Sequence, residues 1–360
     1  MHKRVRYGII GFGGIAENRT AREGFALDRE RFPRGAPGPY TLVGATDIDP
    51  GREKTARAYG LQWYASADAM LSDPGIDAIY IATPNSRHAE IAAEAIAGGR
   101  HVLLEKPMTT SVADAEQLCR MAVAKGVSLS VNLMMKKNSL NRQARSLLRQ
   151  GIIGTVEHIV THMEFLYGST PEEAAAWRCS RPEERGGPIG DVASHCMYMG
   201  EFLYDDRITS LRCTYTPRTL EIAVENGAVI SYRTAGGYTG TCRVAFNQPR
   251  GNLAATIAGQ GFDAYGTGGT LSGLGTLFQL SGHPDEPYAI HLLLDSGSET
   301  KKIDADPDKQ ENIYQAQIAE HAESILSGTP MDGTDGLHNL SLVEACYRSA
   351  EENGREIAVD

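Results

Sequence analysis

A glycine-rich turn near the start of the chain is the first place where residue types and spacing indicate chemistry. In "YGIIGFGGIAEN", the spacing Gly11-x-Gly13-x-x-Ala16 follows directly on an apolar run that is typical of a strand. Gly11 permits a tight turn, Gly13 lets the backbone approach a pyrophosphate, and a small residue at 16 lets helix and strand pack closely. The pattern predicts a dinucleotide-binding turn, although by itself it also fits an empty tight turn.

An acidic residue, Asp47, ends the next predicted strand, "YTLVGAT". A carboxylate at that place accepts hydrogen bonds from the adenosine ribose hydroxyls of NAD. The spacing from the glycine turn exceeds the usual ~20 residues, and a loop at 31–40 accounts for the excess. Ile48 offers nothing to the 2′-phosphate of NADP, so we expect NAD, with NADP less favoured but kept open by the nearby Arg52. Alternatively, Asp47 caps a helix, for which Asp49 is the better candidate.

The third feature is the segment "HVLLEKPMTTS", in which an apolar run at 101–104 ends abruptly in Glu105-Lys106-Pro107. A lysine at the start of a loop is ordinarily a solvated surface residue. Here it stands between a carboxylate and a proline at the point where a buried strand leaves its sheet. This placement makes Lys106 a candidate functional residue.

The elements that must position these residues alternate along the first 134 residues. Apolar runs at 5–10, 41–46, 76–82, 101–104 and 127–133 predict strands, and helical patterns separate them. The clearest helix is "SVADAEQLCRMAVAKG", in which Ser111 is the expected cap and Gly126 the expected end. Alternating strands and helices predict an α/β fold with a parallel, doubly wound sheet of the Rossmann type.

The second part of the chain changes character near "MMKKN", residues 134–138. Strand-like runs dominate from about residue 155, among them "TVEHIVTHMEF", "RITSLRCTYT", "AVISYRT", "TCRVAF", "LAATIAG", "FDAYG" and "AIHLLL". Helices are expected near 191–203, 311–327 and 337–353. We therefore predict two domains: 1–134, a dinucleotide-binding Rossmann domain, and 135–360, an α+β substrate-binding and oligomerisation domain with a large, mostly antiparallel open sheet.

Composition narrows the classes of partner. The chain has 360 residues and a formal net charge of −10, which argues against nucleic acid or an anionic membrane surface as a partner. No apolar run is long enough to cross a bilayer, and the start of the chain makes a poor signal peptide. Six scattered cysteines without a CxxC pair indicate a reducing compartment. We expect a cytoplasmic enzyme with a small-molecule substrate.

Taken together, these segments resemble the Gfo/Idh/MocA family of oxidoreductases. The likeness covers nearly the whole chain: "GIIGFGGIA", Asp47, "IATPNSRHAEIAAEAIAGGRHVLLEKPM", "GIIGTVEHI", "GGPIGDVASH" and "YGTGGTLSG". The spacing of "ATPNSRHAE" and "EKP" is the most specific part. The family often has a glycine two residues after the acid of "GDVASH", where this chain has Ala193.

The resemblance implies that Lys106 lies where nicotinamide and substrate meet, often beside a cis proline bond. An X–Pro bond adopts the cis form at modest cost, which suits Pro107 to such a bend. Asn85 and His88 are implied on the nicotinamide side. The cofactor-binding residues expected from the motifs and the resemblance are Gly11, Gly13, Gly14, Ile15, Asp47, Ala82, Thr83, Pro84, Asn85, His88, Glu105 and Lys106.

The family also carries an acid and a histidine four residues apart, which match Asp191 and His195. On a helix the two lie one turn apart on the same face. Oxidising a secondary alcohol removes a hydride from carbon and a proton from oxygen, and imidazole accepts a proton near neutrality. The resemblance therefore implies His195 as the proton acceptor and Lys106 as the group that polarises the oxygen. Asp191 either orients His195 or binds a second hydroxyl.

The strand "EHIVTHMEFLYG" places His158, His162 and Glu164 on one face. The two histidines lie about 13 Å apart along an extended strand, too far for one metal ion, so we expect no metal and instead a sheet face or subunit interface. Substrate contacts from Tyr167, Trp177 or Arg178 have no support from spacing.

Three functions remain open from the sequence. The leading one is an NAD-dependent dehydrogenase or reductase of a sugar, cyclitol or sugar derivative, acting as a homodimer or homotetramer. The first rival is a redox-neutral glycosidase that retains its NAD. The second is a non-catalytic regulator that senses NAD(P), which would have little need for Lys106, Asp191 and His195 together.

Overall fold

The computed structural model describes residues 4–248, 256–257, 259–277, 290–304 and 311–359. The chain forms two units, one made of Met1–Met134 with Asn312–Leu337 and the other of Met135–Glu311 with His338–Asp360. The first crossing between them falls at the predicted boundary near residue 134.

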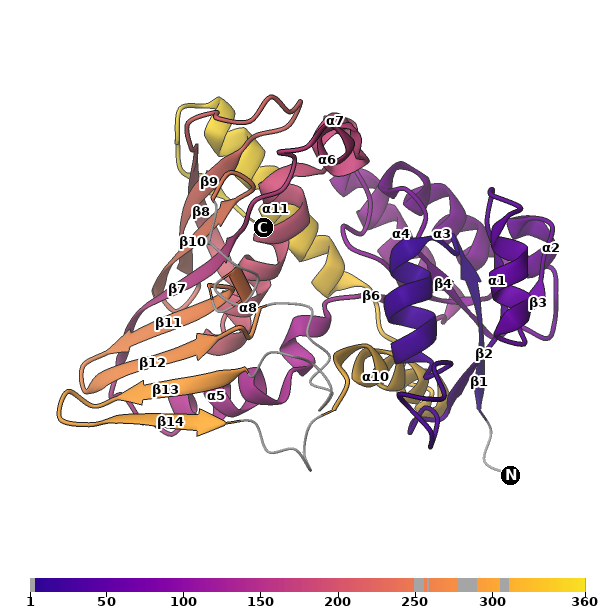
Figure 1. Cartoon of the computed structure of the whole chain (residues 1–360), viewed down its shortest axis with the longest axis horizontal. Helices are drawn as coiled ribbons and strands as arrows, with labels where there is room; N and C mark the ends of the chain where they lie inside the picture. Colours follow the sequence, from indigo (N-terminus) through magenta and orange to yellow (C-terminus); the bar gives the residue numbers. More distant parts are fainter. Residues whose placement is uncertain (1–3, 249–255, 258, 278–289, 305–310, 360) are drawn as a thin grey trace. The chain divides into compact units, whose positions relative to one another are not determined.

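The first unit is built on a six-stranded sheet in the order β3-β2-β1-β4-β5-β6 (Figure 1). All neighbouring strands are parallel, and this order is that of a Rossmann fold. The order reverses between β1 and β4, so the ends of these two strands form the expected ligand-binding edge. The strands are β1 (Val5–Ile10), β2 (Tyr40–Thr46), β3 (Gln62–Trp63), β4 (Ala78–Ile81), β5 (His101–Leu104) and β6 (Leu129–Val131).

The helices of this unit begin and end at residues with clear local reasons. Helix α4 starts where Ser111 Oγ accepts a hydrogen bond from Asp114 N, and it stops at Gly126, which adopts φ 65°. Both ends agree with the sequence prediction. The helices preceding α10 are η1 (Ala16–Gly24), α1 (Arg52–Ala58), α2 (Ala67–Leu71), η2 (Asn85–Arg87), α3 (His88–Ala97) and α4 (Val112–Lys125).

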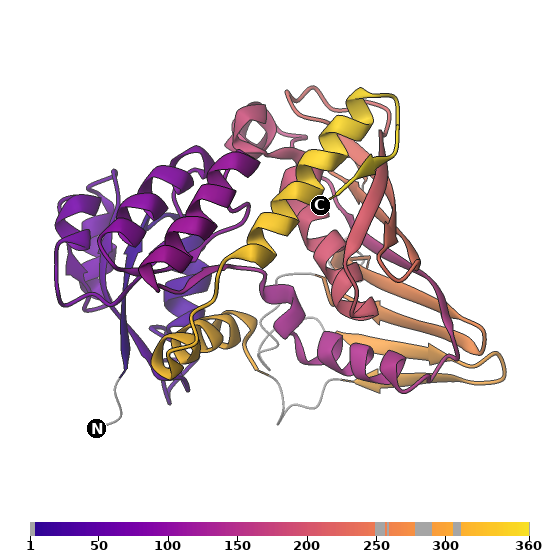
Figure 2. The same ribbon diagram turned by 180° about the vertical axis from the view of Figure 1, so that it is seen from behind.

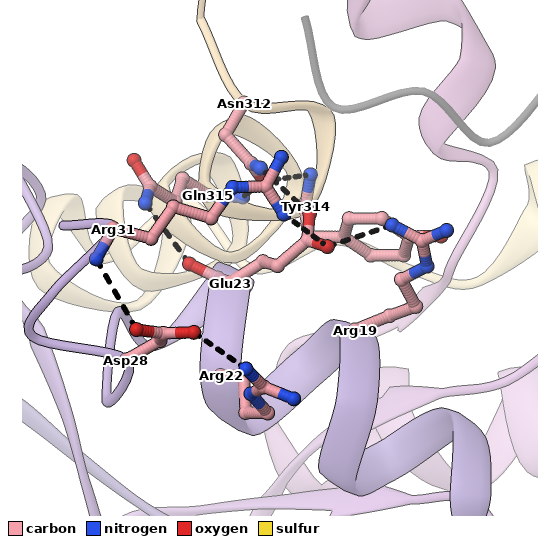
Figure 3. A network of polar contacts seen from close by, with 8 residues as sticks. All are labelled: Arg19, Arg22, Glu23, Asp28, Arg31, Asn312, Tyr314 and Gln315. Carbon is pink, nitrogen blue, oxygen red and sulfur yellow. Dashed lines mark hydrogen bonds and ion pairs between the residues drawn. The ribbon is translucent and has the colours of Figure 1, made fainter. Parts of the chain in front are cut away.

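Helix α10 (Ile313–Ser327) corrects the predicted domain division, because it belongs to the first unit. Its Ile318 and Ala322 are buried in the same apolar core as β1. Figure 3 shows the polar part of this contact around Glu23, a buried carboxylate at the end of η1. Glu23 accepts hydrogen bonds from Arg19 and from Asn312, the cap of α10, at 2.7 and 3.1 Å. Sequence order alone does not reveal such a return of the chain.

The second unit contains a nine-stranded sheet in the order β14-β13-β12-β11-β7-β10-β9-β8-β15. The pair β7–β10 is parallel and the other pairs are antiparallel, as predicted for a large, mostly antiparallel sheet. The strands are β7 (Val156–Glu164), β8 (Ile208–Tyr215), β9 (Gly227–Thr234), β10 (Thr239–Ala245), β11 (Gly261–Gly266), β12 (Gly269–Leu274), β13 (His291–Asp295), β14 (Thr300–Asp304) and β15 (Ile357–Ala358).

One face of this sheet is covered by α5, α8 and α11, as the two opposite views show (Figures 1 and 2). Burial alternates along the strands, so Ile230 is buried towards the helices while Val229 and Tyr265 are exposed on the other face. The described helices of this unit are η3 (Met134–Lys137), α5 (Ser139–Arg149), α6 (Pro171–Ala175), α7 (Trp177–Ser180), η4 (Pro182–Glu184), η5 (Pro188–Ala193), α8 (Ser194–Tyr204) and α11 (Thr334–Glu351). The first residues of η3 and of α11 lie in the first unit.

Some elements differ from the sequence prediction. The strands β3 and β15 were not predicted, because two residues are too few to show a period. The strands β12 and β14 were not predicted either, because glycine in the first and charged residues in the second obscure the alternation of apolar and polar residues. The predicted strand "LAATIAG" lies largely outside the described residues. No described helix is both long and apolar enough to span a membrane.

Candidate active site

The glycine turn after β1 is pressed against the end of β4. The amide groups of Gly11 and Phe12 both donate to Thr46 O, at 3.0 and 3.2 Å. Gly11 adopts φ 88°, and a Cβ atom there would lie 2.7 Å from the backbone of Ala82 and Thr83. Only glycine fits this position.

Gly13 and Gly14 stand in a different environment. A Cβ atom at either position would meet no atom of the described residues within 4 Å, apart from the chain immediately around it. Protein packing therefore does not require glycine here, and the open space lies at the start of η1, where a helix offers amide groups to an anion. The residues fit the close approach of a dinucleotide pyrophosphate.

Asp47 follows β2 at the same edge of the sheet. Its Oδ1 accepts a hydrogen bond from Asp49 N at 2.9 Å, and Asp49 in turn accepts one from Gly51 N at 2.8 Å. Asp47 is therefore held in a local turn. Asp49, which accepts from the residue just before α1, is the acidic residue closer to the start of that helix. Arg52 pairs with Glu17 at 3.0 Å, so the cation that kept NADP open already has a carboxylate partner.

The residues after β4 surround a buried histidine. His88 is fully buried, with Nδ1 2.9 Å from Pro107 O and Nε2 3.1 Å from Thr83 O. It thus bridges the loop after β4 to the loop after β5, which is a structural role. The neighbouring Asn85 is also buried, and contacts of either residue with a cofactor stay a prediction.

Glu105 is the centre of a buried network at the end of β5. Its carboxylate accepts hydrogen bonds from Tyr80 Oη, from Asn132 Nδ2 at 2.8 Å and from Lys106 N at 3.2 Å. Thr20 Oγ1 of η1 donates to Tyr80 Oη at 3.0 Å. Burial and then the neighbouring Glu105 raise the pKa of Tyr80 well above its usual value, so the phenol stays protonated and donates.

Lys106 follows directly and is half-buried. The Lys106–Pro107 peptide bond is cis, as the family resemblance implies. The backbone of Lys106 is thus fixed on one side by the bond to Glu105 and on the other by Pro107, whose carbonyl oxygen contacts His88.

Asp191 and His195 lie in the second unit on one continuous helical run formed by η5 and α8. Arg178 Nε of α7 donates to Asp191 Oδ2 at 3.2 Å, and the Arg178 guanidinium lies over the ring of Trp177 at 4.6 Å. Nothing in the sequence assigns Arg178 a role at the site, because its spacing from Asp191 follows no helical or strand period.

The His195 side chain is almost fully buried, with Nδ1 3.1 Å from Tyr198 Oη. Tyr198 Oη also accepts a hydrogen bond from Met135 N at 3.0 Å. The partner of Nδ1 is therefore a neutral hydroxyl, which can donate to the ring or accept from it. This fixes the orientation of the imidazole. The sequence analysis missed Tyr198, whose only signal is its place one helical turn after His195.

The strand β7 that carries His158 and His162 holds them apart. His158 contacts the hydroxyls of Thr239 and Thr241 at 2.9 and 3.0 Å. His162 lies 3.6 Å from both Glu164 and Asp263. A search of the described part of the chain finds no group of three or more histidine, cysteine or acidic side chains arranged to hold a metal.

Comparison with known families shows to which family the chain belongs. The model described as "Oxidoreductase family, NAD-binding Rossmann fold" of the Gfo/Idh/MocA group matches residues 5–133. The model of the Gfo/Idh/MocA C-terminal domain matches residues 141–272. Together they cover more than half of the chain, which therefore belongs to the Gfo/Idh/MocA family of oxidoreductases. Its relatives are reductases and dehydrogenases, and this protein is an enzyme of that kind.

Individual relatives match this chain over nearly its whole length. A 1,5-anhydro-D-fructose reductase of Ensifer adhaerens is 28% identical over 356 residues, covering 96% of both chains. An inositol dehydrogenase homologue from Azotobacter vinelandii, solved with NAD+, superposes with a TM-score of 0.78 at 22% identity, covering 99% of this chain and 98% of that one. A 3-ketoreductase from Actinomadura kijaniata, solved with TDP-benzene and NADP, has a TM-score of 0.76 at 19% identity, covering 96% and 98%.

The charged cluster on β7 yields a prediction about stability. Asp263 and then Glu164 raise the pKa of His162 to about 9, so the folded state stabilises the imidazolium. This stabilisation is fully present below the unfolded pKa of ~6.5 and is lost as the pH rises through about 9. We expect His162→Asn to lower the free energy of unfolding by roughly 2 kcal/mol at pH 6 and by much less at pH 10.

Urea unfolding at the two pH values measures this difference. His158→Asn on the same strand is the matched control, because burial lowers the pKa of His158 and its partners are hydroxyls. The same loss at pH 6 and pH 10 in His162→Asn would show that the ion pairs contribute nothing.

Proposed function

We propose that this chain is an NAD-dependent oxidoreductase that transfers a hydride between nicotinamide and a secondary alcohol or ketone of a sugar, cyclitol or sugar derivative. The observation that carries the proposal is the dinucleotide cradle at Gly11–Gly14 together with Lys106, whose backbone Glu105 anchors, in a chain of this family. The full-length relative from Ensifer adhaerens, named for reduction of an anhydro sugar, supports the substrate class.

The choice of NAD rests on Asp47 and Arg52. A carboxylate after β2 accepts from a ribose 2′-hydroxyl and repels a 2′-phosphate. Arg52, the cation that kept NADP open in the sequence, pairs with Glu17. Structures of similar fold contain NAD+ in one case and NADP in another, so the fold does not decide between the two cofactors. The preference for NAD therefore rests on Asp47 and Arg52.

The residues divide the chemistry as follows. Bound nicotinamide would accept or supply the hydride. His195 takes the proton from the substrate hydroxyl, since an imidazole accepts a proton near neutrality and the contact of Nδ1 with Tyr198 orients the ring. Lys106 polarises the reacting oxygen with its ammonium group. Asp191, paired with Arg178, presents a fixed carboxylate that binds a further hydroxyl of a polyol, the second of the two roles open to it from the sequence.

Two alternatives share this fold. A glycosidase that retains NAD would use the same groups for transient oxidation and elimination, and a regulator would need the cofactor cradle alone. The buried network around Glu105, which anchors Lys106, favours an enzyme, because a regulator gains nothing from an anchored lysine.

We further propose a cytoplasmic location and a homo-oligomer. All six cysteines are free and buried, which suits a reducing compartment. The face of the nine-stranded sheet opposite its helices carries exposed Val229 and Tyr265, a surface of the kind that a second copy covers.

The first prediction here concerns the cofactor. NAD should be used with a higher kcat/KM than NADP, and Asp47→Ser should reduce that preference at least about tenfold, because both an attraction and a repulsion are lost. Asp49→Ser is the matched control, since Asp49 makes a similar backbone hydrogen bond. Unaltered protein that prefers NADP would contradict the assignment.

The second prediction separates His195 from Lys106. His195→Asn should leave NAD binding intact and lower kcat by about 10²–10⁴, the usual contribution of a general base, with loss of the pH limb due to imidazole. Lys106→Ala should lower kcat and also raise the KM for the substrate, because the ammonium group binds the reacting oxygen. Steady-state kinetics across pH measures both. Near-normal turnover with an unchanged pH profile in His195→Asn would remove His195 from the mechanism.

The third prediction concerns assembly. Light scattering at micromolar concentration should give the mass of a dimer or tetramer, and Tyr265→Asp should shift it towards the monomer, because a charge would be buried in the interface. Leu326→Asp, at an exposed position of α10, should leave the mass unchanged. A monomer in the unaltered protein would refute the proposal.

A further inference from the structure

The backbone segment Arg185–Gly190, here called the strap, leads directly into Asp191 and is packed unusually closely. A Cβ atom on Gly186 would lie 2.5 Å from Arg178 O, and one on Gly190 would lie 2.0 Å from Arg185 O. The strap therefore rests on the backbone of α7, the element that supplies Arg178. Its position sets both members of the Arg178–Asp191 pair.

A buried carboxylate holds the strap from the other side. Glu225 lies just before β9, is only 9% exposed, and accepts a hydrogen bond at Oε1 from Ile189 N at 2.7 Å. Gly187 adopts φ 74°, and a Cβ atom there would lie 2.6 Å from the same oxygen. The glycine leaves the space into which the carboxylate reaches. Ile189 is two residues from Asp191.

Helix α11 supplies two further contacts. Tyr347 Oη donates to Gly186 O at 3.2 Å, and Arg185 pairs with Glu344 at 2.7 Å. Glu225, Tyr347, Arg185 and Glu344 all line one cavity of about 440 Å³. Of the strap itself only Arg185 lines this cavity, and Gly186–Gly190 are buried behind it. Directed polar contacts from Glu225, Tyr347 and Glu344 therefore hold the strap at the cavity wall.

We propose that Glu225 is a positioning residue for the reaction proposed above: its carboxylate fixes the strap and, through it, the carboxylate of Asp191. The proposal rests on the proposed function for its kinetic consequence only. Burial raises the pKa of Glu225. The bond to Ile189 N needs only an acceptor oxygen, which a glutamine also provides.

The test compares two substitutions of similar size. Glu225→Met removes the acceptor but fills the volume, and Glu225→Gln keeps an acceptor oxygen. We expect Glu225→Met to lower kcat about 10- to 100-fold with NAD affinity unchanged, as for a small displacement of a binding group, and Glu225→Gln to restore most of the rate. Amide exchange at Ile189, measured by mass spectrometry on the peptide 186–192, should speed up in the methionine variant alone.

Two further variants control the comparison. Glu351→Gln changes another carboxylate of the same cavity wall and should leave kcat and exchange unchanged. Tyr347→Phe removes the hydroxyl that donates to Gly186 O of the strap and should lower kcat about 3- to 10-fold. This variant tests whether polar contacts position the strap even if Glu225→Met does not fold.

Normal kcat in Glu225→Met, or an equal loss in the methionine and glutamine variants, would overturn the proposal. Normal kcat in Tyr347→Phe, where the methionine variant is unfolded, would also overturn it. If the unaltered protein oxidised no polyol at all, the proposed function would fail, while exchange at Ile189 would still report whether Glu225 holds the strap.

Discussion

The first unit depends on one buried carboxylate. Glu105 stands at the end of β5 and is bonded to Tyr80 of β4, to Asn132 after β6 and to the amide of Lys106. A buried carboxylate is costly unless donors surround it, and here the donors come from the three neighbouring strand ends. These hydrogen bonds to Glu105 therefore connect the carboxyl ends of β4, β5 and β6. The backbone of Lys106 is held as a consequence, between the glutamate that accepts from its amide and the proline that follows.

The second unit positions its groups by a different means. His195 is held by a neutral hydroxyl, and Asp191 by Arg178 and by the strap leading into it. This hydroxyl can donate to the ring or accept from it, so the contact at Nδ1 is compatible with either protonation state of the imidazole. Asp191 keeps a permanent ion pair, which suits a group that binds and orients.

Much of the fold was predictable because its signals are local. The strand 101–104 and the ends of α4 follow from an apolar run, a serine and a glycine, and they appear where predicted. The return of α10 to the first unit was not predictable, because Asn312 meets Glu23 across 289 residues of sequence. For the same reason the candidate site was predictable only in part: motifs and the family resemblance point to Lys106 and Asp191, whereas the contacts of Tyr80, Asn132 and Glu225 form only on folding.

The most direct test of the central claim is to follow the transferred atom. A panel of aldoses, cyclitols, sugar acids and glycosides would first identify an alcohol that turns over with NAD, and that alcohol would then be supplied with deuterium at the reacting carbon. Our account predicts one deuterium at C4 of the reduced nicotinamide for each molecule of ketone formed. Cleavage of a glycoside with no net reduction of the cofactor would contradict it and favour the redox-neutral glycosidase.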